Sequence, residues 1–170
     1  MEKMKKRLMM WILMFGISVL GSYYLDLYFS LTYLESLSLY LRIFGLVLII
    51  ISSLLLRASG KALKHFGMTS KKGFGETDTL VTTGIYGCMR HPHHTGIALF
   101  VLGVGFLISS FSFLTIFVPL FWFAIYLFVK RVEEPEAIKK FGEKYIEYSK
   151  KVPGFIPRIN CFMKKENTTP

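Results

Sequence analysis

The chain has 170 residues and a formal net charge of +10, and 52% of its residues are hydrophobic. This length suits a single domain, 1–170, and the hydrophobic share is too high for an ordinary soluble domain. The basic residues flank apolar segments rather than forming a separate stripe, which argues against nucleic acid as a partner. The composition therefore indicates a small integral membrane protein surrounded by membrane lipids.

Long apolar segments predict an all-α fold with about four transmembrane helices. We expect the spans at about 8–29, 39–56, 95–109 and 112–130. The first span would reach roughly 33 Å at the usual helical rise, which is enough to cross the hydrocarbon core. The segment Arg57–Gly67 after the second span is typical of a short amphipathic piece on the membrane surface. The apolar stretch Thr95–Val129 is too long for one span, so we expect a tight helical hairpin that turns at Ser109–Ser112.

The distribution of Lys and Arg predicts the orientation. Four precede the first span, six lie in Arg57–Arg90 and ten follow Val129, whereas the two expected outer connections have none. By the positive-inside rule, both termini and the long middle loop are cytoplasmic. Without a targeting signal, this pattern fits a prokaryotic inner (plasma) membrane. Cys88 and Cys161 lack metal-binding spacing, and we expect reduced thiols on the cytoplasmic side.

An amphipathic cytoplasmic helix is expected after the fourth span. Apolar residues recur there at helical spacing: Ala137, Phe141, Tyr145, Tyr148 and Val152. Pro135 suits the first turn of this helix but disfavours helical geometry at the preceding residue. We therefore expect Glu133 and Glu134 to lie at a corner between the fourth span and the tail helix.

The segment Leu80–Gly96 concentrates ionisable residues at the mouth of a membrane span, where such groups are functional candidates. Pro92 should push His91 out of helical geometry and begin a helix, whose N-terminal N–H groups favour an anion. Arg90 adds a planar set of donors suited to a carboxylate or phosphate. The sequence thus predicts an anion-binding position here.

Glu133 and Glu134 follow at the other end of the expected hairpin, so both clusters should reach one membrane face. These carboxylates suit an ammonium, a ribose hydroxyl pair or a positive sulfonium. Three tyrosines offer faces for an adenine or a cation: Tyr86, Tyr145 and Tyr148. S-adenosylmethionine has every group on that list, whereas NADPH or a phospholipid head group satisfies parts of it.

Simpler explanations exist for each residue. Arg90 suits an interfacial positive-inside residue, Glu133 and Glu134 suit solvated ion pairs with Lys130 or Arg131, and tyrosines at helical spacing suit packing. A metal site built from three histidines is the remaining alternative: His91, His93 and His94. Adjacent helical residues point about 100° apart, so these three cannot easily converge and we expect no metal.

Two motifs, in this order around a hydrophobic hairpin, carry a resemblance. The first is Leu80-Val81-Thr82-Thr83-Gly84-Ile85-Tyr86 followed by Arg90-His91-Pro92 and Gly96; the second is Glu133-Glu134 followed by Phe141-Gly142, Tyr145, Tyr148, Val152-Pro153 and Phe155-Ile156-Pro157. Together they resemble the isoprenylcysteine carboxyl methyltransferase family and related phospholipid methyltransferases. The chain departs from that pattern at Ile85, Gly87 and His94, where the family commonly has Pro, Arg and Tyr.

The resemblance implies S-adenosylmethionine-dependent methyl transfer, with S-adenosylhomocysteine as the product. The acceptor would be lipophilic (an isoprenylcysteine-like carboxylate, a phospholipid amine or a thiol) and would enter from the bilayer to the cytoplasmic face. The implied cofactor-binding part is 80–158, and the implied cofactor residues are Tyr86, Arg90, His91, Pro92, Gly96, Glu133, Glu134, Tyr145 and Tyr148. The catalytic candidates are Arg90, Glu134 and His94, the last two as conceivable bases for a thiol acceptor.

Two other functions remain open from the sequence. One is an NADPH-dependent membrane reductase acting on a sterol-like or enone lipid, because such enzymes look related in their C-terminal half. The other is a non-catalytic membrane protein that binds a lipid head group. The sequence leaves the methyl acceptor and the oligomeric state open.

Overall fold

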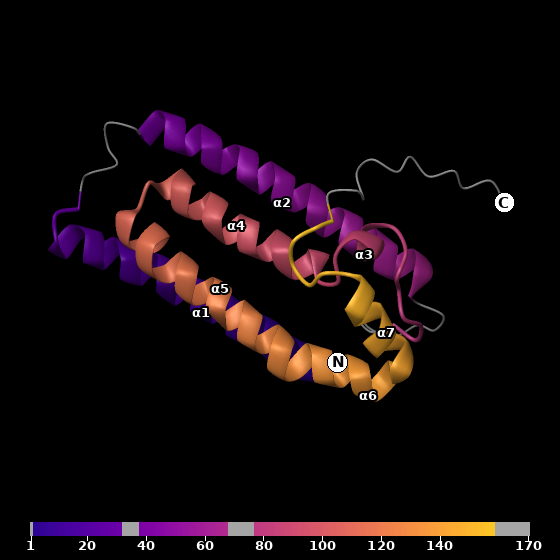
Figure 1. Ribbon diagram of the computed structural model, residues 1–170. Coiled ribbons are helices and arrows are strands. Elements are labelled where there is room, and N and C mark those ends of the chain that lie inside the picture. Colours follow the sequence, from indigo (N-terminus) through magenta and orange to yellow (C-terminus); the bar gives the residue numbers. More distant parts are fainter. Residues whose placement is uncertain (1, 32–37, 68–76, 159–170) are drawn as a thin grey trace. The chain divides into compact units, whose positions relative to one another are not determined.

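The computed structural model describes residues 2–31, 38–67 and 77–158, and it describes side chains from residue 6 onward. These residues form helices and no strands, so the all-α prediction is confirmed (Figure 1). The helices are α1 (Glu2–Tyr28), α2 (Ser38–Phe66), α3 (Ile85–Cys88), α4 (Pro92–Ile108), η1 (Phe113–Phe117), α5 (Val118–Phe128), η2 (Val129–Glu133), α6 (Glu134–Phe141) and α7 (Glu143–Lys151), where η denotes a π-helix.

Three of the described helical segments are long and apolar enough to cross a membrane: Lys6–Tyr28, Ser38–Phe66 and Phe113–Phe141. The helix Pro92–Ile108 is also apolar but shorter. Large apolar side chains lie exposed on the long helices, as with Ile17 at 66% and Leu54 at 59% exposure. Such surfaces require lipid rather than water, so the chain is an integral membrane protein. The count of four spans stays a prediction.

The chain divides into two compact units, and we describe each by itself. The first unit comprises Met1–Ser52 and Ala98–Tyr126. In it, the rings of Trp11 and Phe15 pack on Phe121 with centroid distances of 5.4 Å and 6.4 Å. A Cβ atom on Gly45 would lie 2.5 Å from the Gly103 carbonyl oxygen, so α2 and α4 approach closely here because both residues are glycine.

The predicted hairpin turn at Ser109–Ser112 is confirmed. Helix α4 ends at Ile108, and Ser109 has a left-handed φ of 53°. Asp26 stabilises the restart of the helix, because its carboxylate accepts a hydrogen bond from the Ser110 hydroxyl and another from the Ser112 N–H at 2.9 Å. Sequence reasoning missed this capping role of Asp26.

Two helices run further than expected. Helix α2 continues without a break to Phe66, so Arg57–Gly67 is not a separate surface piece. The corner expected at Glu133 and Glu134 is wrong as well, because both have helical dihedral angles and the helical segment continues to Phe141. The physical reason is the π-helical turn η2, which changes the hydrogen-bond ladder just where an α-helix would need the N–H that Pro135 lacks.

The bend falls instead at Gly142, which has φ 58° and ψ −137°. Only glycine adopts such a conformation at little cost, and it splits the expected tail helix into α6 and α7 (Figure 1). Helix α7 then ends at Lys151, two residues before Pro153. The break turns α7 away from the line of α6.

Candidate functional site

The predicted site residues lie in the second unit, which comprises Ser53–Ile97 and Leu127–Pro170. Pro92 opens α4, as predicted, and holds Arg90 and His91 just outside the helix. Glu133 closes η2 and Glu134 opens α6. Local sequence thus fixes each pair at a helix boundary, and tertiary packing brings the two pairs together.

Arg90 and Glu134 form the centre of the site. Arg90 Nη2 lies 3.0 Å from Glu134 Oε1, and the two side chains are only 11% and 13% exposed. Lys130 Nζ contacts the other oxygen, Glu134 Oε2, at 2.8 Å. Arg90 Nη1 also donates to the Ser149 carbonyl at 3.2 Å. Two cations therefore compensate one largely buried carboxylate, which makes this a structural ion-pair network rather than an interfacial charge.

The segment Pro153–Phe155 fastens the start of α4. The N–H groups of Arg90 and His91 donate to the Pro153 and Gly154 carbonyls at 2.8 Å and 2.9 Å. The Thr95 hydroxyl donates to the Phe155 carbonyl at 2.9 Å, and the Phe155 ring lies 5.5 Å from the His91 ring. Sequence reasoning quoted this segment only as part of a motif and missed its role in holding the backbone beside Arg90.

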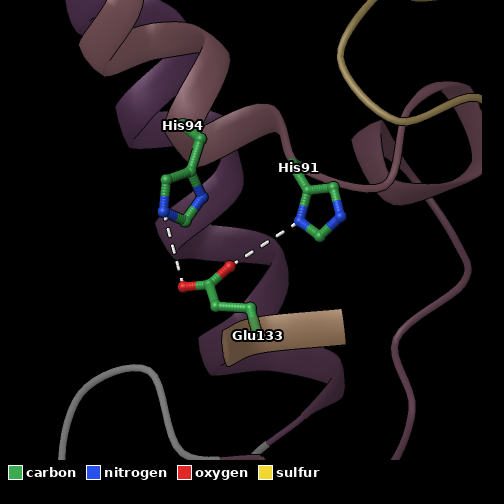
Figure 2. A group of neighbouring side chains, drawn as sticks. All are labelled: His91, His94 and Glu133. Atoms are coloured by element: carbon green, nitrogen blue, oxygen red, sulfur yellow. Dashed lines mark ion pairs between the residues drawn. The ribbon is translucent and has the colours of Figure 1, made fainter. Parts of the chain in front are cut away.

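His91 and His94 meet Glu133, as Figure 2 shows. His91 Nδ1 lies 3.7 Å from Glu133 Oε2, and His94 Nε2 lies 3.4 Å from Glu133 Oε1. The other ring nitrogen of His91, Nε2, lies 3.3 Å from Glu134 Oε1. Burial lowers the pKa of His91 below its ordinary value, although the contact with Glu134 opposes that shift. The neutral ring is therefore favoured.

His93 takes no part in this group. Its Nδ1 lies 3.4 Å from the Ser59 hydroxyl, on another side of α4. This agrees with the divergence expected for adjacent helical residues. Among the described residues, the histidines and carboxylates that could share a metal ion are His91, His94 and Glu133, whose ligand atoms all lie within 4.8 Å of one another.

The three tyrosines divide into two kinds. The Tyr148 hydroxyl donates to the Tyr86 carbonyl at 2.6 Å, and both rings are buried, so this pair holds the site's wall together. Burial raises the pKa of both, and it raises the pKa of Tyr145 to about 12, with Glu134 as the next contributor. All three are neutral phenols at physiological pH, and the buried Tyr145 hydroxyl has no hydrogen-bond partner among the described residues.

Two buried side-chain atoms lack a hydrogen-bond partner within the described part of the chain: Arg90 Nε and the Tyr145 hydroxyl. An unsatisfied buried donor costs about 1–3 kcal/mol, so native structures rarely leave one without a reason. Tyr145 is also close enough to Arg90, Glu133 and Glu134 to feel their charges. The site therefore offers two unused donors beside its carboxylates, as a bound ligand would require.

The remaining predicted residues have supporting positions. Pro92 and Gly96 are buried in the first turns of α4. Lys130 was not predicted as a site residue, although its spacing of four from Glu134 is a signal that could have found it. Cys88 is disulfide-bonded, so the expectation of a reduced thiol is wrong for it. The lysine-rich sequence around a cysteine does not indicate whether that cysteine forms a disulfide. Cys161 lies outside the described residues.

Comparison with known proteins identifies the family. The family model described as phospholipid methyltransferase matches residues 40–144, which include the Arg-His-Pro segment and both glutamates. The chain belongs to this family. The resemblance seen in the two motifs is thus confirmed.

Proteins similar to this chain share one name. The protein-S-isoprenylcysteine O-methyltransferase of Xenopus laevis is 31% identical over 71% of this chain and 42% of its own length. The Schizosaccharomyces pombe protein of that name is 34% identical over 59% of this chain and 41% of its own length. A structure of a eukaryotic intramembrane Ras methyltransferase is 24% identical, with a TM-score of 0.48, and covers 85% of this chain and 52% of its own. The chain therefore spans less than half the length of the Xenopus laevis and Schizosaccharomyces pombe proteins.

Proposed function

We propose that this family member transfers a methyl group from S-adenosylmethionine to a lipophilic acceptor at the cytoplasmic face of its membrane. The observation that carries the proposal is that the Arg-His-Pro segment contacts Glu133 and Glu134 in a largely buried position. Two buried donors without a hydrogen-bond partner among the described residues lie beside this contact. The family match supports methyl transfer, and the Lys and Arg distribution supports the cytoplasmic face. The proposed cofactor-binding part is 80–158.

The donors fit the cofactor's methionine portion. Arg90 Nε and the Tyr145 hydroxyl would donate to its carboxylate, which satisfies both atoms. Glu133, of intermediate exposure at 32%, would hold a positive group or a ribose hydroxyl. Glu134 already contacts Arg90 and Lys130, so its part is to position the Arg90 guanidinium. Tyr148 and Tyr86 would form the wall through their mutual hydrogen bond.

S-adenosylmethionine supplies a methyl group on a positive sulfonium, which is a good leaving group. The chain's own residues therefore need mainly to bind, align and exclude water. The relatives are named for O-methylation of isoprenylcysteine, which points to a carboxylate acceptor attached to a prenyl chain. A carboxylate is already an anion, so neither Glu134 nor His94 has to remove a proton from it.

Ligand binding by detergent-purified protein tests the proposal. Calorimetry with S-adenosylmethionine, S-adenosylhomocysteine and NADPH in parallel should show binding of the two adenosyl ligands only. Arg90→Ala should abolish that binding, whereas Arg131→Ala, which removes an exposed arginine, should preserve it. Binding of NADPH alone favours the reductase, and absence of all binding by folded protein favours a non-catalytic lipid-binding role; either result overturns the proposal.

The acceptor is identified by transfer of a radiolabelled methyl group. Three acceptors separate the options: an S-prenylated N-acetylcysteine, vesicles containing phosphatidylethanolamine, and an unmodified lipophilic thiol. We expect label in the prenylated cysteine as a base-labile methyl ester. Label in the phospholipid amine would retain the methyltransferase and replace the acceptor.

A further inference from the structure

We propose that His91, His94 and Glu133 form a binding site for a divalent transition-metal cation, with Zn²⁺ as the best match to the donor set. The Glu133 carboxylate lies between the two rings and directs one oxygen at each, as Figure 2 shows. One nitrogen from each histidine and a carboxylate oxygen all lie within 4.8 Å of one another. This site does not rest on methyl transfer, and its ion would take the place of the positive group proposed above for Glu133.

The local sequence builds two of the three ligands into one helix start. His91 and His94 are three residues apart, so they share a side of the chain where α4 begins. Glu133 reaches them from η2. A site made of all three histidines is not formed, because His93 lies against Ser59. Glu133 takes the third ligand position instead.

One arrangement of the His91 protons leaves a place for a cation between His91 and Glu133. Both ring nitrogens of His91 face carboxylates, but a neutral imidazole carries one N–H. If Nε2 donates to Glu134, the Nδ1 lone pair faces an oxygen of Glu133 at 3.7 Å, a distance too long for an ordinary hydrogen bond. In that arrangement, a cation bound by both Nδ1 and the Glu133 carboxylate would compensate the two lone pairs.

The separations suit metal ligands. A tetrahedral Zn²⁺ with bonds of about 2.0–2.2 Å sets its ligand atoms roughly 3.3–3.6 Å apart. The nitrogen–oxygen contacts to Glu133, one to each carboxylate oxygen, are 3.4 Å and 3.7 Å, and one ligand atom from each of the three residues lies within 4.8 Å of the others, so small side-chain movements would bring the ligand atoms to these separations. Two imidazoles and one carboxylate favour Zn²⁺ and its neighbours over Mg²⁺ or Ca²⁺, which prefer oxygen. Three protein ligands leave a fourth position for a water or a ligand oxygen.

The surrounding contacts resemble the support that metal-bound histidines usually have. Such a histidine donates its second N–H to a carboxylate, which orients the ring. His91 Nε2 has this partner in Glu134, which Arg90 and Lys130 hold in turn. Both histidine side chains are largely buried, at 9% and 12% exposure, so a bound ion would be shielded from competing water.

Metal binding is measured on tag-free protein without cofactor or acceptor, after removal of metal with a chelator. Calorimetric titration with Zn²⁺, and elemental analysis after gel filtration, should give one ion per chain. His94→Asn and Glu133→Gln should weaken binding at least about 100-fold, and Glu134→Gln about 10–100-fold. The matched control His93→Asn changes the adjacent histidine and should leave the affinity unchanged.

Substitution with Co²⁺ gives a second measurement on the wild-type protein. This test does not depend on whether any variant folds. We expect the intense visible bands of a four-coordinate site. A weak spectrum like that of hydrated Co²⁺, no stoichiometric Zn²⁺, or an equal loss of affinity in His93→Asn would overturn the proposal. Cofactor calorimetry on metal-free protein is independent of these outcomes, so either proposal can fail alone.

Discussion

Substitution of Glu134 by Gln tests whether the buried ion pair organises the site. The change keeps the side chain's size and removes its charge. The Arg90 side chain, which is only 11% exposed, then has no carboxylate to pair with. Removing one member of a buried pair costs about 3–5 kcal/mol. The contact with Lys130 adds little because that side chain is 40% exposed, and exposed pairs contribute about 0–1 kcal/mol. Arg90 keeps its bond to the Ser149 carbonyl, so we expect a loss near the lower limit, about 3 kcal/mol.

The assay is thermal unfolding in detergent, with Glu147→Gln as an exposed matched control. A loss of about 3 kcal/mol corresponds to a decrease in Tm of roughly 6–12 °C for a chain of this size. Combining Glu134→Gln with Arg90→Met should cost less than the sum of the two single changes, by about 1–3 kcal/mol, because the second change removes the uncompensated charge. A Tm equal to that of the control, or strictly additive losses, would refute the reasoning.

Four further predictions concern single residues. Burial lowers the pKa of His91, so below about pH 6.5 the unfolded chain binds more protons than the folded chain. The stability that depends on neutral His91 should be fully present above that pH and decrease below it, and His91→Asn should reduce, without abolishing, this dependence of the Tm. Tyr148→Phe should lower the free energy of unfolding by about 1–2 kcal/mol because it leaves a buried carbonyl unpaired. Tyr145→Phe removes an unsatisfied buried hydroxyl, so it should raise the free energy of unfolding of the ligand-free protein, by up to about 1–3 kcal/mol, and weaken S-adenosylhomocysteine binding roughly 10-fold; equal effects of the two tyrosine variants would contradict this assignment. Gly45→Ala should cost about 1–3 kcal/mol through a clash with backbone, whereas a Cβ on Gly16 meets nothing, so Gly16→Ala should not lower the Tm.

Sequence by itself determined the features that depend on neighbouring residues. Apolar runs gave the helical membrane fold, Pro92 gave the start of α4, and Ser109–Ser112 gave the hairpin turn. Each follows from local backbone chemistry or from the length of an apolar segment, which the chain carries wherever it packs. The two motifs also identified the family before any contact was known.

Tertiary structure decided which of these residues meet. The ion pair of Arg90 with Glu134 joins positions far apart in the chain, and so does the group formed by His91, His94 and Glu133. Local rules even misplaced the glutamates, since they predicted a corner before Pro135 where a π-helical turn keeps the helix intact. Such contacts depend on the rotation of one packed helix relative to another, and the spacing of residues within either helix does not contain that rotation.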